Sequence, residues 1–130
     1  MSENRNYIKT VDESGSINIS EDVIAAIVAA ATTEVKGVYG LYYSAGKELS
    51  QAISKRGIAR SVKLVLTEDD VQVDVYVLLA KDYSASDVGA DIQKSVMTAV
   101  EDSVGVKVSA VNVHICGVSL KSKPQPQSEK

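Results

Sequence analysis

A chain of 130 residues fits a single domain that can bury a core without disulfides or metals. Hydrophobic residues make up 45% and charged residues 24% of the chain, which excludes an intrinsically disordered protein. A net charge of −3 and a pI near 5.1 argue against a nucleic-acid binder with a basic surface. The single cysteine excludes an internal disulfide and fits a reducing compartment.

The N-terminal third is expected to change from polar chain to helix. Residues 1–14 are polar and mixed in charge, which predicts a flexible arm without a signal peptide. Residues 15–19 alternate over a length that suits a short edge strand. Ser20 fits an N-cap, and apolar residues at three- and four-residue spacing predict a core helix over residues 23–35. The strongly apolar part of this helix is too short to span a bilayer.

The middle of the chain predicts a hairpin. Gly37 and Gly40 are expected to end the first helix. A second, weaker helix or a loop lies between residues 46 and 57. Residues 62–80 then alternate apolar and polar side chains around an acidic turn, so we expect two antiparallel strands with one buried face.

A second amphipathic helix follows the hairpin. Ser84 with Asp87 three residues later resembles a capping box, and Gly105 is expected to end the helix. The apolar stripe between them consists of Val88, Ile92, Val96, Ala99, Val100 and Val104. Such a stripe predicts packing against a sheet.

The last apolar run, residues 106–118, changes its pattern in the middle. Apolar residues fall on even numbers up to Ala110 and on odd numbers from Val111. Because side chains alternate along a strand, this change predicts a β-bulge near Ala110–Val111, or two short strands with a bend. In either case we expect Asn112, His114 and Cys116 to share the face opposite Val111. The composition after residue 119 predicts a disordered tail over residues 120–130.

Together these elements predict one α+β domain over residues 15–119, in the order β-α-(α)-β-β-α-β. We expect a three- to four-stranded sheet with the helices packed on one face. One KH arrangement has the same order of elements, so a KH-like shape is also consistent with the sequence.

No motif in the sequence predicts an enzyme, so we expect no catalytic, cofactor-binding or metal-binding residues. His114 and Cys116 are too few for a zinc site, and two outward positions on one strand rarely place a base correctly for a nucleophile. The acidic residues Glu68, Asp69 and Asp70 suit a solvated turn, and their spacing matches no EF-hand loop.

One segment does suggest nucleic-acid binding. Gly37-Val38-Tyr39-Gly40 has the GXXG pattern with which KH domains clamp a nucleic-acid backbone. Its middle residues are not basic, which argues against phosphate binding and makes a nucleic-acid partner the lesser alternative. The bases that would form the accompanying patch are Lys36, Lys47, Lys55, Arg56 and Arg60.

Two stretches carry a resemblance to a known family. Residues 15–24, with the alanine-rich helix and residues 35–40 after them, are similar to the start of the alkaline shock protein family of Gram-positive bacteria. Residues 105–118 resemble the closing signature of that family, and Ile92, Gln93, Val96 and Val100 fit its second helix. The resemblance covers about residues 15–118.

The resemblance implies a cytoplasmic, non-enzymatic protein of the envelope stress response. Some members of the family assemble into larger structures and reach the membrane through a membrane-anchored relative, and others are linked to envelope or lipid homeostasis. It therefore implies homologous partners or further copies of the chain, a peripheral position at the inner face of the membrane, and no direct insertion.

We expect the contact surface to lie in the glycine–tyrosine segment, because tyrosine is enriched at interfaces. The residues of this predicted surface are Gly37, Val38, Tyr39, Gly40, Tyr42 and Tyr43.

Overall fold

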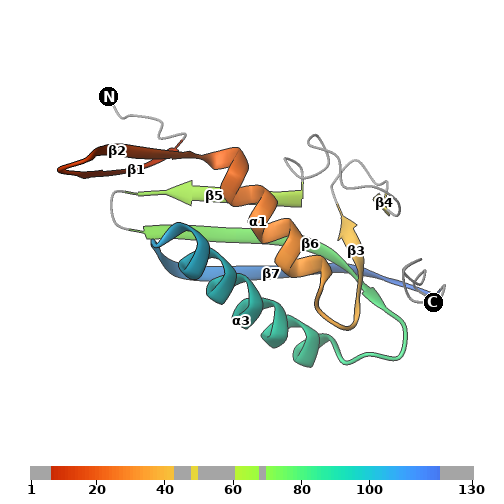
Figure 1. Ribbon diagram of the computed structural model, residues 1–130. Coiled ribbons are helices and arrows are strands. Elements are labelled where there is room, and N and C mark those ends of the chain that lie inside the picture. The colour runs from red at the N-terminus through yellow and green to blue at the C-terminus, as the bar shows by residue number, and fades with distance from the viewer. Residues whose placement is uncertain (1–6, 43–47, 50–60, 68–69, 121–130) are drawn as a thin grey trace, which may run out of the picture.

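The computed structural model describes residues 7–42, 48–49, 61–67 and 70–120. The helices are α1 (Glu21–Thr33) and α3 (Ala85–Val104). The strands are β1 (Tyr7–Asp12), β2 (Gly15–Ser20), β3 (Val38–Tyr42), β4 (Glu48–Leu49), β5 (Val62–Leu66), β6 (Asp70–Ala80) and β7 (Lys107–Ser119). The expected α+β class, with both helices on one face of the main sheet, is confirmed (Figure 1).

The main sheet has five strands among the described residues, more than the three to four predicted. The additional strand β4 lies within residues 46–57, for which the sequence predicted a weak helix or a loop. The other residues of that range lie outside the described part of the chain. The predicted tail, residues 120–130, is described only at Leu120.

Strand β6 is the centre of the sheet. Strand β7 runs parallel to it along one edge, from Asp70 opposite Lys107 to Ala80 opposite Ser119. On the other edge, β5 and β3 pair with successive parts of β6, and both are antiparallel. A parallel neighbour needs a crossover, and α3 supplies it between β6 and β7.

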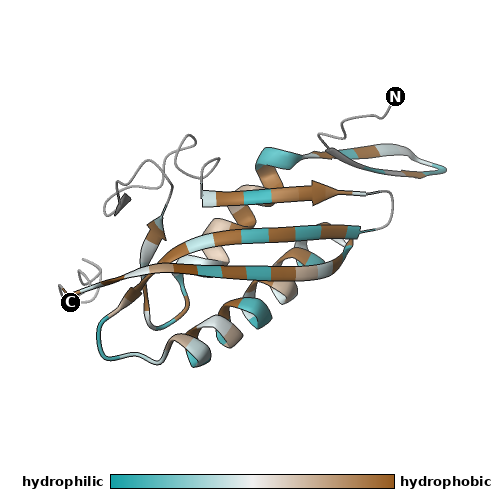
Figure 2. Ribbon diagram, turned by 180° about the vertical axis from the view of Figure 1, so that it is seen from behind, coloured by the Kyte–Doolittle hydropathy of each residue, from teal (hydrophilic) through white to brown (hydrophobic). Residues whose placement is uncertain are grey.

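The core lies between the sheet and the helices. The odd-numbered residues of β6 from Val71 to Leu79 are buried, whereas Gln72, Asp74 and Tyr76 lie on the opposite face. Figure 2 shows this alternation of apolar and polar residues along the strands, with the helices behind the sheet. The predicted hairpin over residues 62–80 is confirmed by the antiparallel pairing of β5 with β6.

Helix α1 forms where the sequence predicted the first helix. The Oγ of Ser20 accepts a hydrogen bond from the Val23 amide at 3.3 Å, which confirms the predicted N-cap. After the C-cap residue Glu34, the chain turns at Gly37, whose φ of +101° favours glycine. Gly40 does not end the helix, because it lies within β3.

Helix α3 follows the predicted pattern closely. Ser84 is its N-cap, and Gly105 is its C-cap with φ of +81° and an amide that donates to the Glu101 carbonyl. The buried members of the stripe are Val88, Ile92, Val96 and Val100. The two caps therefore set the ends of the helix, and the buried stripe sets the face that it turns to the core.

We expect Ser84→Ala to lower the free energy of unfolding by about 1 kcal/mol. The Ser84 Oγ accepts from the Asp87 amide at 3.3 Å, and alanine would leave that amide without its partner. Ser86→Ala is the control, because Ser86 is exposed in the same turn and does not cap the helix. Urea unfolding followed by circular dichroism measures both variants; equal stability of the two would contradict the capping role.

Strand β7 contains the predicted bulge. The register with β6 shifts between Val108 and Ala110, so Ser109 is the extra residue and both Val108 and Val111 are buried. A second shift, which the sequence did not predict, leaves Cys116 without a partner in β6.

The N-terminal arm differs from the expectation. Residues 7–12, predicted as flexible chain, form β1 and pair with β2 in a separate two-stranded sheet. The turn between them is tight: the Ser14 amide donates to Asp12 Oδ1 at 2.8 Å, and Gly15 has φ of +130°. The expected edge strand over residues 15–19 exists, but in this hairpin and not in the main sheet (Figure 1).

Candidate interaction surfaces

The predicted GXXG loop is absent from the structure. Val38 and Gly40 pair with Leu79 and Leu78 of β6, so the segment begins a strand and does not form a loop between two helices. Gly37–Gly40 therefore does not form the loop between two helices that a KH-type clamp requires, while nucleic-acid binding by this chain stays a prediction.

The glycine–tyrosine segment is largely part of the core. Gly37, Val38 and Gly40 are buried, and only the side chains of Tyr39 and Tyr42 are half-buried. Tyr43 lies outside the described residues. The interaction role of this segment stays a prediction, for which these two tyrosines are the described side chains that a partner would reach.

The bases of the alternative patch are mostly outside the described part of the chain. Lys36 is exposed directly after α1. The other four, Lys47, Lys55, Arg56 and Arg60, belong to residues 43–47 and 50–60, so nothing in the structure groups them.

The open face of the sheet carries a polar cluster that joins β6 to β7. His114 Nε2 lies 3.0 Å from Asp74 Oδ1, where the imidazole N–H donates to the carboxylate. The Tyr76 ring stacks on His114 with centroids 4.4 Å apart and planes 12° apart. The parallel register causes both contacts, because it sets Tyr76 directly opposite His114. The imidazole is thus held between a carboxylate and a ring.

Cys116 is not activated by its neighbour. Its Sγ contacts the backbone carbonyl of His114 at 3.5 Å, and the imidazole is bound to Asp74 instead. Partial burial raises the pKa of the Cys116 thiol above its usual value. A nucleophilic cysteine needs the opposite shift, so this geometry provides no activated nucleophile.

We expect Cys116 to be alkylated by iodoacetamide more slowly in the folded protein than in guanidinium chloride at neutral pH. A raised pKa means that less thiolate is present at any pH below that pKa, and the thiolate is the reacting form. The rate should rise as the pH is raised. Cys116→Ser supplies the blank, since the chain has one cysteine. Faster alkylation of the folded protein at neutral pH would contradict this account.

The acidic turn has a structural role at its described end. Thr67 Oγ1 accepts from the Asp70 amide at 3.0 Å and lies 2.8 Å from Asp70 Oδ1, which closes the hairpin. Glu68 and Asp69 lie outside the described residues. Among the residues that are described, no three His, Cys, Asp or Glu side chains group as a metal site would require.

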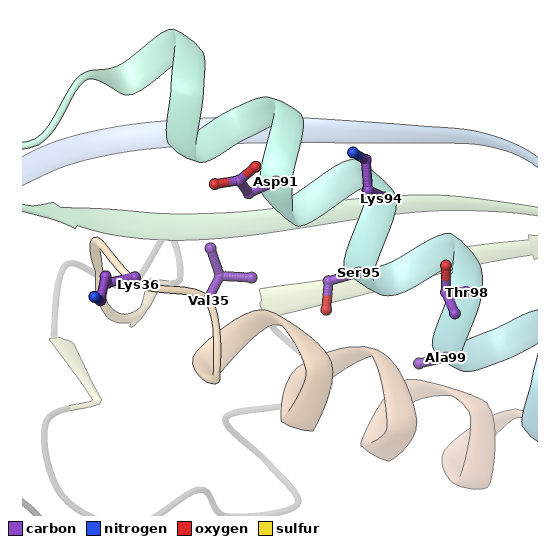
Figure 3. Close-up of a pocket in the computed structure, with 7 residues that line it drawn as sticks. All are labelled: Val35, Lys36, Asp91, Lys94, Ser95, Thr98 and Ala99. Atoms are coloured by element: carbon purple, nitrogen blue, oxygen red, sulfur yellow. The ribbon is translucent and has the colours of Figure 1, made fainter.

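A groove opens between the end of α1 and the outer face of α3. Its volume is about 500 Å³, and its lining residues are Val35, Lys36, Asp91, Lys94, Ser95, Thr98 and Ala99. In Figure 3, Ser95, Thr98 and Ala99 extend from α3 towards α1, while Val35 projects between the helices. Ser95 Oγ donates a hydrogen bond to the Ala31 carbonyl oxygen, with 3.3 Å between the two atoms, and this bond links α3 to α1.

A second, smaller groove lies between α3 and β7. Its volume is about 280 Å³, and it is lined by Ala85, Ser86, Gly89, Ala90, Gln93, Val113 and Ile115. None of the residues that line this second groove was expected from the sequence to form a site. A usable signal was present, because small residues recur at four-residue spacing on α3, as in Ala85 and Gly89, away from its buried stripe.

Within the described residues, no helix is both long enough and apolar enough to cross a membrane.

The sequence of the chain is similar to those of a known protein family. Residues 9–120 match the profile of the alkaline shock protein 23 family, whose description is a cell envelope-related function. The chain is 36% identical over 118 residues to the protein Spy1535 of Streptococcus pyogenes, covering 90% of this chain and 89% of that one. It is 25% identical over 111 residues to the protein YqhY of Bacillus subtilis, covering 85% and 82%. The resemblance to alkaline shock proteins is thereby confirmed.

Solved structures of the MamM CTD are similar in shape at low identity. One of them is 13% identical, with a TM-score of 0.47, and the alignment covers 75% of this chain and 94% of that one. A manganese form of a MamM CTD variant is 12% identical, with a TM-score of 0.48 over 82% and 94% of the two chains.

Proposed function

Because the chain belongs to the alkaline shock protein 23 family, whose function is cell envelope-related, we propose that it serves the cell envelope by binding other proteins, without catalysis. The partners that we propose are further copies or homologues of the chain, together with a membrane-anchored protein. Binding to that anchored protein would hold a cytoplasmic domain at the inner face of the membrane, as part of a stress response.

The groove between α1 and α3 is the observation that carries the proposal of protein contact. It is open, and Val35, Ala99 and the methyl group of Thr98 give it an apolar lining. Lys36 and Lys94 stand at its rim without an ion pair to another described residue. An apolar floor with charged groups at the rim is the arrangement found in protein interfaces, where the centre is dry and the edge is solvated.

Helix-in-groove binding is the mode that this shape fits best. An amphipathic segment of a partner can place its apolar side chains against Val35 and Ala99, while charged residues of both signs at its edge meet Lys36, Lys94 and Asp91. The mode needs no movement of the core, because every lining residue lies at the surface or at its margin.

The test is a crosslinked pull-down from the source cells with wild type, Thr98→Arg and Ser103→Arg. Thr98 is exposed and lines the groove, so arginine there should obstruct it and remove a membrane-anchored partner from the captured proteins. Ser103 is exposed on the same helix and lines neither groove, so its variant should capture what wild type captures. Equal capture by all three proteins would exclude the α1–α3 groove as the contact.

A further inference from the structure

Strand β7 is an edge of the sheet whose first half is protected. Among the described strands it pairs with β6 alone. Two side chains of α3 reach its other edge: Gln93 Nε2 donates to the Val111 carbonyl at 3.1 Å, and Glu101 Oε2 accepts from the Val108 amide at 3.0 Å. Side chains that satisfy the backbone in this way hinder the addition of another strand.

The second half of the same edge is open. Since the Val111 carbonyl points away from β6, the alternation of a strand directs the peptide groups of Val113 and Ile115 the same way. No hydrogen bond from the described residues covers these groups. The groove of about 280 Å³ runs beside them, with the small side chains of α3 on its other wall. Farther along, Val118 is 52% and Leu120 79% exposed.

Gly89 supplies an independent observation. It lies inside α3, where glycine costs about 1 kcal/mol relative to alanine. A Cβ added at Gly89 would have no atom within 4 Å, and its φ is not positive. The single chain therefore gives no reason for a glycine at this position. A second polypeptide packed into the groove would give one, because glycine permits close approach to the helix backbone.

The charge pattern of β7 indicates what kind of strand fits. Between Val108 and Ser119 the strand has no Lys, Arg, Asp or Glu, so a second copy of it would meet no like charge. The short strand β5 differs, because it contains Lys63, as expected of an edge that avoids pairing.

We propose that β7 pairs antiparallel with β7 of a second copy of this chain, around a two-fold axis at Val113. The outward peptide groups of Val113 then meet their equivalents in the other copy, and those of Ile115 meet the outward groups of Val111, whose carbonyl accepts from Gln93 and keeps a second lone pair. Val113 of the second copy, which is only partly buried in its own chain, would then lie beside the groove, next to the small side chains of α3. The inference rests on the proposed action through protein contact and names one surface and one partner.

The test compares purified full-length wild type with Ala90→Arg and Ser103→Arg by light scattering over a range of concentrations. Ala90 is exposed and lines the groove, so arginine there should fill it while keeping the helix. We expect wild type and Ser103→Arg to approach twice 13.8 kDa with rising concentration, and Ala90→Arg to stay at 13.8 kDa. A wild type that is monomeric throughout, or an Ala90→Arg dimer, would overturn the proposal.

Hydrogen exchange locates the contact independently of that variant. In wild type, the amides of Val113 and Ile115 should become protected as the concentration rises, and in Ala90→Arg they should exchange at a constant rate. Dimerisation without this protection would also overturn the proposal. The β7 pairing and the proposed envelope function can fail separately. A monomeric protein that still captures a membrane-anchored protein in cells would refute the β7 pairing alone.

Discussion

Replacing Gly37 by alanine is expected to lower the free energy of unfolding by about 2 to 4 kcal/mol. Its φ is +101°, where a side chain is strained. A Cβ at Gly37 would also lie 2.5 Å from Val88 Cγ2 and 2.8 Å from Tyr83 Cδ2. Val88 is buried at the start of the α3 stripe and cannot move without disturbing the core. Strain and overlap therefore add at this position.

Gly89→Ala is the matched control and should act in the opposite direction. It lacks both the positive φ and the close contacts, so we expect it to raise the stability of the single chain by about 1 kcal/mol. Unfolding in urea at low protein concentration, followed by circular dichroism, measures both variants. The chain has no tryptophan to report unfolding by fluorescence. A Gly37→Ala variant as stable as wild type would show that the turn after α1 is not confined as described.

Truncation of Ile92 is expected to have an effect of similar size. Ile92 is 0% exposed in the centre of the α3 stripe, against the core. Removing buried methyl and methylene groups loses their transfer free energy and leaves a cavity, which costs about 2 to 5 kcal/mol for isoleucine to alanine. Lys94→Ala, an exposed change two residues along the same helix, should cost less than about 0.5 kcal/mol. Similar losses in the two variants would contradict the assignment of the buried face.

Local patterns in the chain were sufficient to predict most of the fold. The caps at Ser20 and Ser84, the end of α3 at Gly105 and the hairpin of β5 with β6 depend on residues close in sequence. The bulge in β7 was also predictable, to within a residue, because a change of parity in an apolar strand has few physical explanations.

Features that depend on distant residues were not predictable. The contact between Asp74 and His114 exists only because β6 and β7 pair in parallel, and the sequence pattern does not specify which strands are neighbours. The two grooves arise from the spacing of α1, α3 and β7, which no single segment determines. The same limit explains the error at Gly40. The short GXXG motif predicted a loop there, whereas pairing with the distant strand β6 makes Gly40 part of β3.

The most direct test of protein contact as the mode of action is a crosslinked pull-down of the full chain, tagged near Lys130, from lysate divided into nuclease-treated and untreated halves. We expect the same proteins in both halves, among them a copy or homologue of the chain and a membrane-anchored protein. Recovery dominated by RNA, with the protein partners lost after nuclease treatment, would contradict this account and favour a nucleic-acid-binding function.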